Sequence, residues 1–297
     1  PGYSWNIPNT KLVHVDVDVA EIGRNYPVDL GIVADARTFL RQVLAEVESR
    51  GKTRTDQSQV WMTQIQGWRH EWEEFTKPNF SLATSPMRPE RVVGDIRKVL
   101  PTDAIISLDS GVHHNWFMQF WEAHLPQTML NAWGYSAMGF GVSGILGAKL
   151  AAPDKPCVSI CGDGGFTMTP HVLCTAVEYD IPAVWVVWNN FAWGAIRDIQ
   201  YGLFEGRELG TAFYQGENRE PYNPDFAAMA RSCGVQASTI TQSDDFAPAL
   251  EHAIKQNRPY LLDVHVDSEV RPPATGSWEL PPIPPKEPVF GRPYTPE

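Results

Sequence analysis

Short apolar runs alternate with longer amphipathic segments over most of the chain from about residue 88 onward. The runs that we expect to be strands lie at 104–108, 157–161, 183–188, 235–239 and 259–266. The segments with helical spacing of apolar residues lie at 89–100, 136–151, 224–233 and 244–256. A further helix is expected to begin at Thr169-Pro170, with Thr169 as the N-cap and Pro170 in the first turn. Nearly continuous apolar strands separated by helices predict an α/β fold, with a parallel sheet covered by helices on both faces.

The first 50 residues show a shorter version of the same alternation. Apolar and polar residues alternate over 12–19, a second apolar run covers 30–35, and an amphipathic helix is expected over 38–47. Two strands followed by a helix form the closing part of a parallel α/β unit. This segment is too small to be a stable domain by itself. We therefore expect the tail of a second α/β domain, whose other part lies on another chain or has been removed.

Polar residues from Arg50 to Ser58 interrupt the pattern and predict a linker. Five large apolar residues then follow at helical spacing: Trp61, Ile65, Trp68, Trp72 and Phe75. We interpret them as a helix that packs an aromatic stripe on the body of the protein, with a ligand platform as the weaker alternative. The expected organisation is a domain remnant, a linker with the striped helix, a main α/β domain and a Pro-rich tail, at residues 1–50, 51–87, 88–270 and 271–297.

Composition and charge restrict the class of protein. The chain has 297 residues, of which 43% are hydrophobic and 20% charged, so it is long enough to bury a sizeable core. The net charge of −11 argues against non-specific binding to nucleic acid or to an anionic membrane. We recognise no secretory signal and no apolar stretch long enough to span a bilayer, and expect a cytoplasmic protein. The cysteines are expected to be buried free thiols, at positions 157, 161, 174 and 233.

Two short stretches carry candidate chemistry where expected strands end. The first is Cys161-Gly-Asp-Gly-Gly-Phe166, and the second is Trp188-Asn-Asn190. Glycines let the backbone approach a ligand and present N–H groups to phosphate oxygens, whereas Asp163 would repel phosphate unless a divalent cation lay between them. Mg²⁺ takes oxygen ligands, and Asn190 offers an amide oxygen at the neighbouring strand end. Because carboxyl ends of parallel strands share one edge of the sheet, the pattern predicts a metal-bound diphosphate.

The same stretches carry a family resemblance. Gly-Asp-Gly-Gly-Phe followed by Asn-Asn resembles the signature of thiamine diphosphate enzymes. The stretches 131–154, around Met138-Gly-Phe-Gly141, and 109–116 resemble patterns of acetolactate synthases. The chain therefore resembles the acetolactate synthase and glyoxylate carboligase family, with about residues 88–266 as the diphosphate-binding domain and 10–48 as the end of the central domain. The resemblance implies the thiamine diphosphate-binding fold for the main domain.

The resemblance also implies site residues. Asp163 and Asn190 would be side-chain ligands of Mg²⁺, and Ala192 would contribute its carbonyl oxygen. Met138 would be the apolar wedge that bends the cofactor, and the Ser136 carbonyl would accept a hydrogen bond from its 4′-amino group. The other residues expected at the cofactor are Gly111, Val112, His113, Gly162, Gly164, Gly165, Gly194 and Ala195.

Several positions depart from the family pattern. Val112 stands where the family has a diphosphate-binding Gln, and Gly165 replaces a common Ser, so each loses a side-chain contact. The adjacent His113 and His114 also suggest a transition-metal site. We treat this as the weaker alternative, because side chains of neighbouring residues point apart. The residues expected in a substrate pocket are Ala195, Ile196 and Ile199, with core packing of a helix as an equal alternative. The polar stretch 201–222 is expected to be a loop over the site, with a surface excursion as the alternative.

The activity implied by the resemblance is decarboxylation of a small 2-oxo acid followed by carboligation or acyl transfer, as in acetolactate synthase. The stretch 189–197 is also similar to glyoxylate carboligases and to sulfoacetaldehyde acetyltransferase. A non-oxidative 2-oxo acid decarboxylase and a sulfoacetaldehyde acetyltransferase-like enzyme therefore stay open as alternatives. A non-catalytic subunit of the same fold is the alternative from a different class. A nicotinamide-binding domain is disfavoured, because no Gly-x-Gly-x-x-Gly follows the first strand.

The resemblance implies that this chain does not act alone. In the family, the glutamate that activates the cofactor usually comes from a pyrimidine-binding domain, which we do not find in the sequence. We therefore assign no catalytic residue to this chain. We expect a second polypeptide that carries this domain, in a dimer or tetramer, and leave FAD open as a further cofactor of the complete protein.

Overall fold

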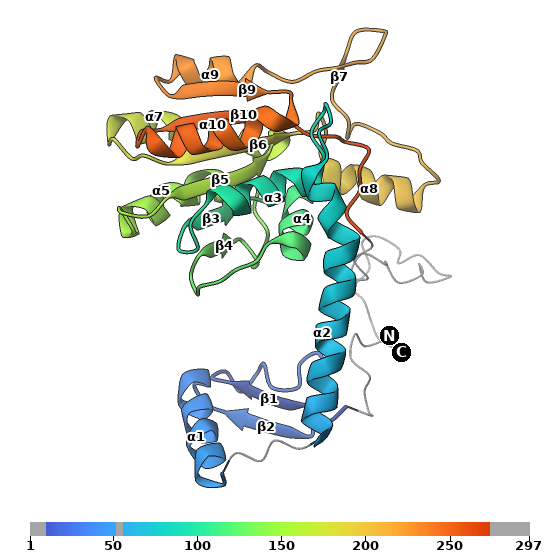
Figure 1. Cartoon of the computed structure of the whole chain (residues 1–297), viewed down its shortest axis with the longest axis vertical. Helices are drawn as coiled ribbons and strands as arrows, with labels where there is room; N and C mark the ends of the chain where they lie inside the picture. Colours follow the sequence, from blue (N-terminus) through green and yellow to red (C-terminus); the bar gives the residue numbers. More distant parts are fainter. Residues whose placement is uncertain (1–9, 52–55, 274–297) are drawn as a thin grey trace, which may run out of the picture. The chain divides into compact units, whose positions relative to one another are not determined.

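The computed structural model describes residues 10–51 and 56–273, which fall into two compact units that divide between Glu71 and Trp72 (Figure 1). In the first unit, strand β1 (Val13–Asp16) pairs in parallel with β2 (Leu30–Val33), and helix α1 (Ala36–Ser49) follows. The Asp35 side chain caps α1 by accepting a hydrogen bond from the Thr38 N–H at 2.8 Å.

The strand predicted over 12–19 ends earlier than expected, at Asp16. The side chain of Asp16 accepts from the N–H of Asp18, and that of Asp18 accepts from the N–H of Ala20, both at 2.8 Å. Such bonds between an Asp side chain and the backbone two residues on form a turn, which competes with strand pairing.

Helix α2 (Asp56–Thr76) begins inside the stretch predicted as a linker and carries the aromatic stripe. The helix is confirmed, and near its C-terminal end Trp72 of the stripe contacts Phe120 of the second unit, with ring centroids 5.4 Å apart. Within the same stripe, Trp61, Trp68 and Phe75 are exposed by 54%, 49% and 62%. Trp61 and Trp68 instead contact each other edge to face, with ring centroids 5.5 Å apart. Helical spacing decides which side chains share a face, but it does not decide whether another layer covers that face.

The second unit is built on a six-stranded parallel sheet with strand order β4-β3-β5-β6-β10-β9. The strands are β3 (Ile105–Leu108), β4 (Met129–Asn131), β5 (Cys157–Gly162), β6 (Val184–Asn189), β9 (Gln236–Ile240) and β10 (Tyr260–His265). The chain leaves β3 toward β4 on one side and returns to β5 on the other. The strand order therefore reverses between β3 and β5, which is where such sheets open a crevice for a ligand.

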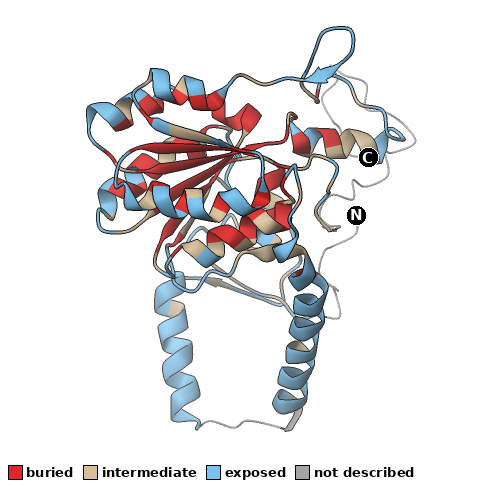
Figure 2. Ribbon diagram, turned by 45° about the horizontal axis from the view of Figure 1, so that its top comes forward, coloured by how far each residue is buried: buried red, intermediate tan, exposed pale blue. Residues whose placement is uncertain are grey.

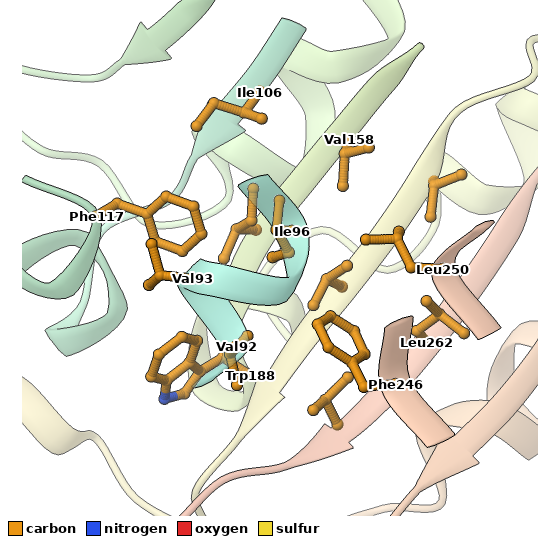
Figure 3. Packing of buried hydrophobic residues seen from close by; sticks show 14 of the residues in the cluster. Val92, Val93, Ile96, Ile106, Phe117, Val158, Trp188, Phe246, Leu250 and Leu262 are labelled. Carbon is orange, nitrogen blue, oxygen red and sulfur yellow. The ribbon is translucent and has the colours of Figure 1, made fainter. Parts of the chain in front are cut away.

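Helices cover both faces of this sheet, as the fold class predicted. One face carries α3 (Pro89–Val99), α4 (Val112–Phe120) and α10 (Ser243–Lys255). The other carries α5 (Phe140–Ala151), α7 (Val172–Glu178) and α9 (Phe226–Ser232). Buried residues concentrate in the strands and on the inward sides of these helices (Figure 2). In Figure 3, Ile96 of α3 and Phe246 of α10 lie over the strands that carry Val158 and Leu262.

Short elements complete the unit and lie mostly near the ends of the sheet. They are η1 (Lys77–Ser81), α6 (Asp163–Phe166), α8 (Gly194–Leu203), β7 (Tyr214–Gln215) and β8 (Glu220–Pro221). The sequence patterns did not predict α4 or β4. Both are short, with nine and three residues, so the period of their apolar residues is a weak signal.

Two predicted helix starts are wrong. Helix α5 begins at Phe140 rather than at residue 136, because Ser136 and Gly139 have left-handed φ values of 53° and 89° that interrupt a helix. Helix α7 begins at Val172, and Thr169 does not cap it. The Thr169 hydroxyl instead donates to the Gly139 carbonyl at 3.4 Å.

The four cysteines are free, as predicted, but only Cys157 and Cys161 are buried. Cys174 is exposed on α7, so the prediction of burial is wrong there, and Cys233 is half-buried. Within the described ranges, no helix is both long and apolar enough to cross a membrane. Of the predicted Pro-rich tail, residues 274–297 lie outside the described part of the chain.

Candidate cofactor site

Loops that follow β3, β5 and β6 line one pocket at the carboxyl edge of the sheet. It opens at the reversal of strand order between β3 and β5, the place expected for a ligand in this class of sheet. Its lining residues are Ser110, Gly111, Val112, His113, Met138, Gly162, Asp163, Gly164, Gly165, Trp188, Asn190, Ala192, Trp193, Gly194, Ala195 and Ile196. The pocket thus brings together residues that lie far apart in the sequence, from Ser110 to Ile196.

Asp163 is the carboxylate of the pocket and is only 1% exposed. Its Oδ1 accepts from the N–H of Gly164 at 2.7 Å, and its Oδ2 accepts from the N–H of Ala192 at 3.2 Å and from Asn223 Nδ2 at 2.9 Å. Burial raises the pKa of Asp163 to about 6, although these donors favour the charged form. Burial of a carboxylate costs free energy that a bound cation would offset, so Asp163 is a position where a cation is expected.

The two adjacent amides after β6 have different surroundings. Asn189 is the last residue of the strand, and its Nδ2 donates to Asp263 Oδ1 of β10 at 2.9 Å. Asn190 lines the pocket. A Cβ on Gly194 would lie 2.7 Å from Asn190 Nδ2, so a glycine is needed where α8 begins beside this amide. Asn189 is therefore part of the hydrogen-bond network that joins β6 to β10, whereas the amide of Asn190 is available to a ligand.

Helix α4 contributes His113 to the pocket lining from its first turn. His113 is 1% exposed, and its Nε2 has no hydrogen-bond partner. Burial lowers the pKa of His113 to about 3, so the imidazole is neutral. The ring lies against Gly111, where an added Cβ would come within 2.8 Å of its Cε1. A buried, unpaired ring nitrogen in a pocket lining is a group that a polar ligand can satisfy.

Asp109 is a site residue to which sequence reasoning gave no role. Its two carboxylate oxygens accept from the N–H of Gly139 at 3.0 and 2.9 Å, and Oδ2 also accepts from that of Val142 at 3.4 Å. The carboxylate therefore caps α5 from the end of β3 and holds the loop that carries Met138. Burial raises the pKa of Asp109. The only signal in the sequence was an acid directly after a buried strand and before Ser-Gly.

Most of the residues predicted for the cofactor share this pocket. The predicted residues that line it are Gly111, Val112, His113, Met138, Gly162, Asp163, Gly164, Gly165, Asn190, Ala192, Gly194 and Ala195. Ser136 is exposed and outside the lining, although its hydroxyl contacts that of Ser110 at 3.4 Å. Of the predicted substrate-pocket residues, Ala195 and Ile196 line the pocket and Ile199 does not.

The donor set fits a magnesium-bound diphosphate. Asp163, Asn190 and Ala192 place a carboxylate, an amide and a backbone carbonyl group at one pocket, which are the hard oxygen ligands that Mg²⁺ takes. Four glycines leave the lining without side chains where a phosphate would approach: Gly111, Gly162, Gly164 and Gly165. The N–H of Gly164 already donates to Asp163 in this structure, so it is not a free phosphate donor here.

A transition-metal site at the two histidines has no support from the geometry. His114 Nε2 lies 3.0 Å from Asn131 Oδ1, and its ring lies against that of Trp133, tilted by 59° with centroids 4.7 Å apart. Over the described ranges, no three His, Cys, Asp or Glu side chains are grouped as a metal site would need.

Comparison with known proteins decides the family. Residues 109–264 match the family model described as the thiamine pyrophosphate enzyme C-terminal TPP binding domain, which is more than half of the chain. The chain belongs to the thiamine pyrophosphate enzyme family. Residues 2–43 match the central domain of thiamine pyrophosphate enzymes. The resemblance drawn from the motifs is thus confirmed.

Similar proteins of the family are acetolactate synthase large subunits. The chain is 34% identical over 266 residues to a "Probable acetolactate synthase large subunit" of Methanocaldococcus jannaschii, which covers 88% of this chain and 43% of the relative. It is 33% identical over 268 residues to the acetolactate synthase large subunit of Corynebacterium glutamicum, covering 89% and 42%. The chain spans less than half the length of these curated relatives. The comparisons give no support for FAD.

Proposed function

We propose that this chain holds the diphosphate of thiamine diphosphate and a Mg²⁺ ion in an enzyme that acts on a 2-oxo acid. The observation that supports this most is the buried Asp163 carboxylate beside Asn190 and Ala192 in one pocket. Without a cation, the charged carboxylate would repel a diphosphate at this place. The intact oxygen ligand set argues against a non-catalytic subunit of the same fold.

The residues of this chain would orient the cofactor and keep water away from it. Met138, Trp188 and Ile196 are large apolar residues in the same pocket lining as the polar Asp163 and Asn190. Apolar surroundings lower the local dielectric constant, which strengthens each charge interaction in the pocket. Met138 is on the loop that Asp109 holds, so its position is fixed by the end of β3. When bound, thiamine diphosphate supplies a nucleophilic carbon and an electron sink for decarboxylation.

For the reaction, we propose decarboxylation of the 2-oxo acid followed by carboligation or acyl transfer. The acetolactate synthase relatives support this proposal. Ala195 and Ile196 line the pocket and are the proposed contacts to substrate, while Ile199 is outside the lining. Trp193, which the sequence analysis did not select, also lines the pocket and contacts Phe213 edge to face.

We also propose that the active site is completed by a pyrimidine-binding part outside this chain, in a dimer or tetramer. The pocket lining contains no glutamate that could activate the aminopyrimidine. In addition, the matching relatives are more than twice as long as the aligned region. A site shared between two polypeptides would explain why this pocket has binding groups for the diphosphate but no such glutamate in its lining.

The proposed function is tested on the full chain together with any polypeptide that co-purifies with it. We expect thiamine diphosphate and Mg²⁺ together to raise the melting temperature more than either does alone, because each stabilises the binding of the other. We also expect release of CO₂ from a 2-oxo acid by the complex that carries the pyrimidine-binding part. Absence of any joint melting shift would contradict the proposed cofactor, and a shift without CO₂ release from any 2-oxo acid would contradict the reaction.

Mg²⁺ binding should weaken as the pH falls through about 6. The pKa of Asp163 is raised to about 6 by burial, so below that pH the cation must displace a proton. Displacement of one proton lowers the apparent affinity by about tenfold for each further pH unit. Calorimetric titration with Mg²⁺ at several pH values between about 5 and 8 measures this slope, and an affinity that does not change with pH would contradict it.

The stability of the metal-free protein should show the opposite trend. Because the native state binds the Asp163 proton more tightly than the unfolded chain does, this group adds stability at low pH. That contribution is lost as the pH rises through about 6. Denaturant unfolding without metal, measured over the same pH range on wild-type protein and on Asp163→Asn, checks the sign.

A further inference from the structure

The stretch 201–222, predicted as a loop over the site, together with the adjoining Asn223 contacts both halves of the proposed cation site. It begins at the end of α8, contains the β7–β8 hairpin and ends before α9 (Figure 1). At its end, Asn223 Nδ2 donates to Asp163 Oδ2 at 2.9 Å and to Asn189 Oδ1 at 2.7 Å. Both bonds cross from a loop to the carboxyl ends of strands, and Asn223 lies 60 residues from Asp163 in sequence.

The same segment also holds the loop that carries the amide and carbonyl ligands. The N–H of Trp193 donates to the Thr211 carbonyl and that of Phe213 to the Phe191 carbonyl, each at 2.8 Å. Between them, Ala192 and Ala212 form an antiparallel bridge. Residues 211–223 therefore contact the loop after β5 through one side chain and the loop after β6 through the backbone.

The hydrogen bonds leave the two oxygens of Asp163 unequal. Oδ2 accepts from Ala192 N and Asn223 Nδ2, which occupies both of its lone pairs. Oδ1 accepts from the N–H of Gly164 at 2.7 Å and keeps acceptor capacity. Asn223 cannot turn away easily, because its other bond goes to Asn189, which is itself fixed by Asp263. The carboxylate is therefore arranged to offer one oxygen rather than two.

We propose that Asn223 is a positioning residue that limits Asp163 to one oxygen toward the cation and so favours Mg²⁺ over Ca²⁺. This inference rests on the proposed cation site. Mg²⁺ requires a compact octahedral set, whereas Ca²⁺ accepts more ligands and readily takes a carboxylate through both oxygens. With Asn223 removed, Oδ2 is released and the carboxylate is able to use both oxygens.

The experiment is calorimetric titration with Mg²⁺ and with Ca²⁺, each with saturating thiamine diphosphate, on the full chain and any co-purifying polypeptide. The variants are Asn223→Leu, which keeps the side-chain size, and Asn223→Ala. We expect the affinity for Mg²⁺ to fall by about 10- to 100-fold, as is usual when a residue that supports a metal ligand is lost. The affinity for Ca²⁺ should change much less, so the preference for Mg²⁺ falls.

The matched control is Arg219→Ala. Arg219 lies in the same segment, where it pairs with Glu208 at 3.4 Å and stacks over Tyr214, but it does not contact Asp163. We expect this variant to keep the wild-type affinities for both cations. If loosening of the segment were the cause, Arg219→Ala would reproduce the Asn223 effect.

Each other outcome overturns the proposal. Unchanged affinities in the Asn223 variants, or equal losses for Mg²⁺ and Ca²⁺, would exclude a role in choosing the cation. Loss of the folded state in both variants would assign Asn223 to the stability of the fold instead. If wild-type protein binds neither cation, the proposed function itself fails, which is distinct from failure of this inference alone.

Discussion

Replacement of Asp163 by alanine is expected to abolish Mg²⁺-dependent binding of thiamine diphosphate and to leave the fold in place. The carboxylate is the only charged oxygen among the three proposed ligands, and it is 1% exposed, so no side chain nearby can replace it. The loss should exceed the roughly 100-fold effect that removal of a supporting residue has on metal affinity. The fold should persist, because Asp163 contributes hydrogen bonds at the sheet edge rather than core packing.

Calorimetric titration of the full chain, with any co-purifying polypeptide, measures this effect, and thermal unfolding without metal checks the fold. Asp154→Ala is the matched control, since Asp154 is an exposed acid remote from these loops. It should keep wild-type cofactor binding. Unchanged Mg²⁺-dependent affinity in Asp163→Ala would show that the metal assignment is wrong.

Gly141→Ala is expected to be among the most destabilising single substitutions in the chain. A Cβ at Gly141 would lie 2.5 Å from the backbone nitrogen of Asp109 and 2.8 Å from the carbonyl carbon of Leu108. Neither backbone atom can move without shifting β3, so the cost should reach the upper end of overpacking effects, about 3 kcal/mol. The shift would also pull Asp109 away from the Gly139 N–H, and cofactor affinity should fall as well.

Gly147→Ala on the same helix provides the control. An added Cβ there meets nothing within 4 Å, and Gly147 is exposed. Alanine in an exposed helix interior is favoured over glycine by about 0.5–1 kcal/mol. Denaturant unfolding of both variants should therefore give effects of opposite sign. If both substitutions changed the free energy of unfolding by the same amount, the close approach of α5 to β3 would not be the reason why position 141 requires glycine.

The fold class and the place of the site follow from the sequence because both depend on local pattern. Strands that are apolar on both faces need helices on both sides, so periodicity alone predicts a covered parallel sheet. Parallel strands end at one edge, so Asp163 and Asn190, each directly after an apolar run, had to lie near each other. The structure confirms the sheet and places both residues in one pocket.

The sequence could not assign roles that depend on contacts between distant segments. Nothing local distinguishes Asn189 from Asn190, yet Asn189 bonds to Asp263 while Asn190 lines the pocket. Asp109 had only the weak signal of an acid directly after an apolar run, and Asn223 had none, because their partners lie 30 and 60 residues away. Ile199 shares a helix with Ala195, but the placement of α8 leaves it outside the pocket lining.

The sequence by itself therefore determined which elements form and which chemistry gathers at the carboxyl edge of the sheet. Only the tertiary structure decided which of those groups line the pocket and which support them from behind. The physical reason is that hydrophobic period and turn residues act over a few positions of the chain. The direction of a buried amide or carboxylate is instead set by donors and acceptors that packing brings together from many positions away.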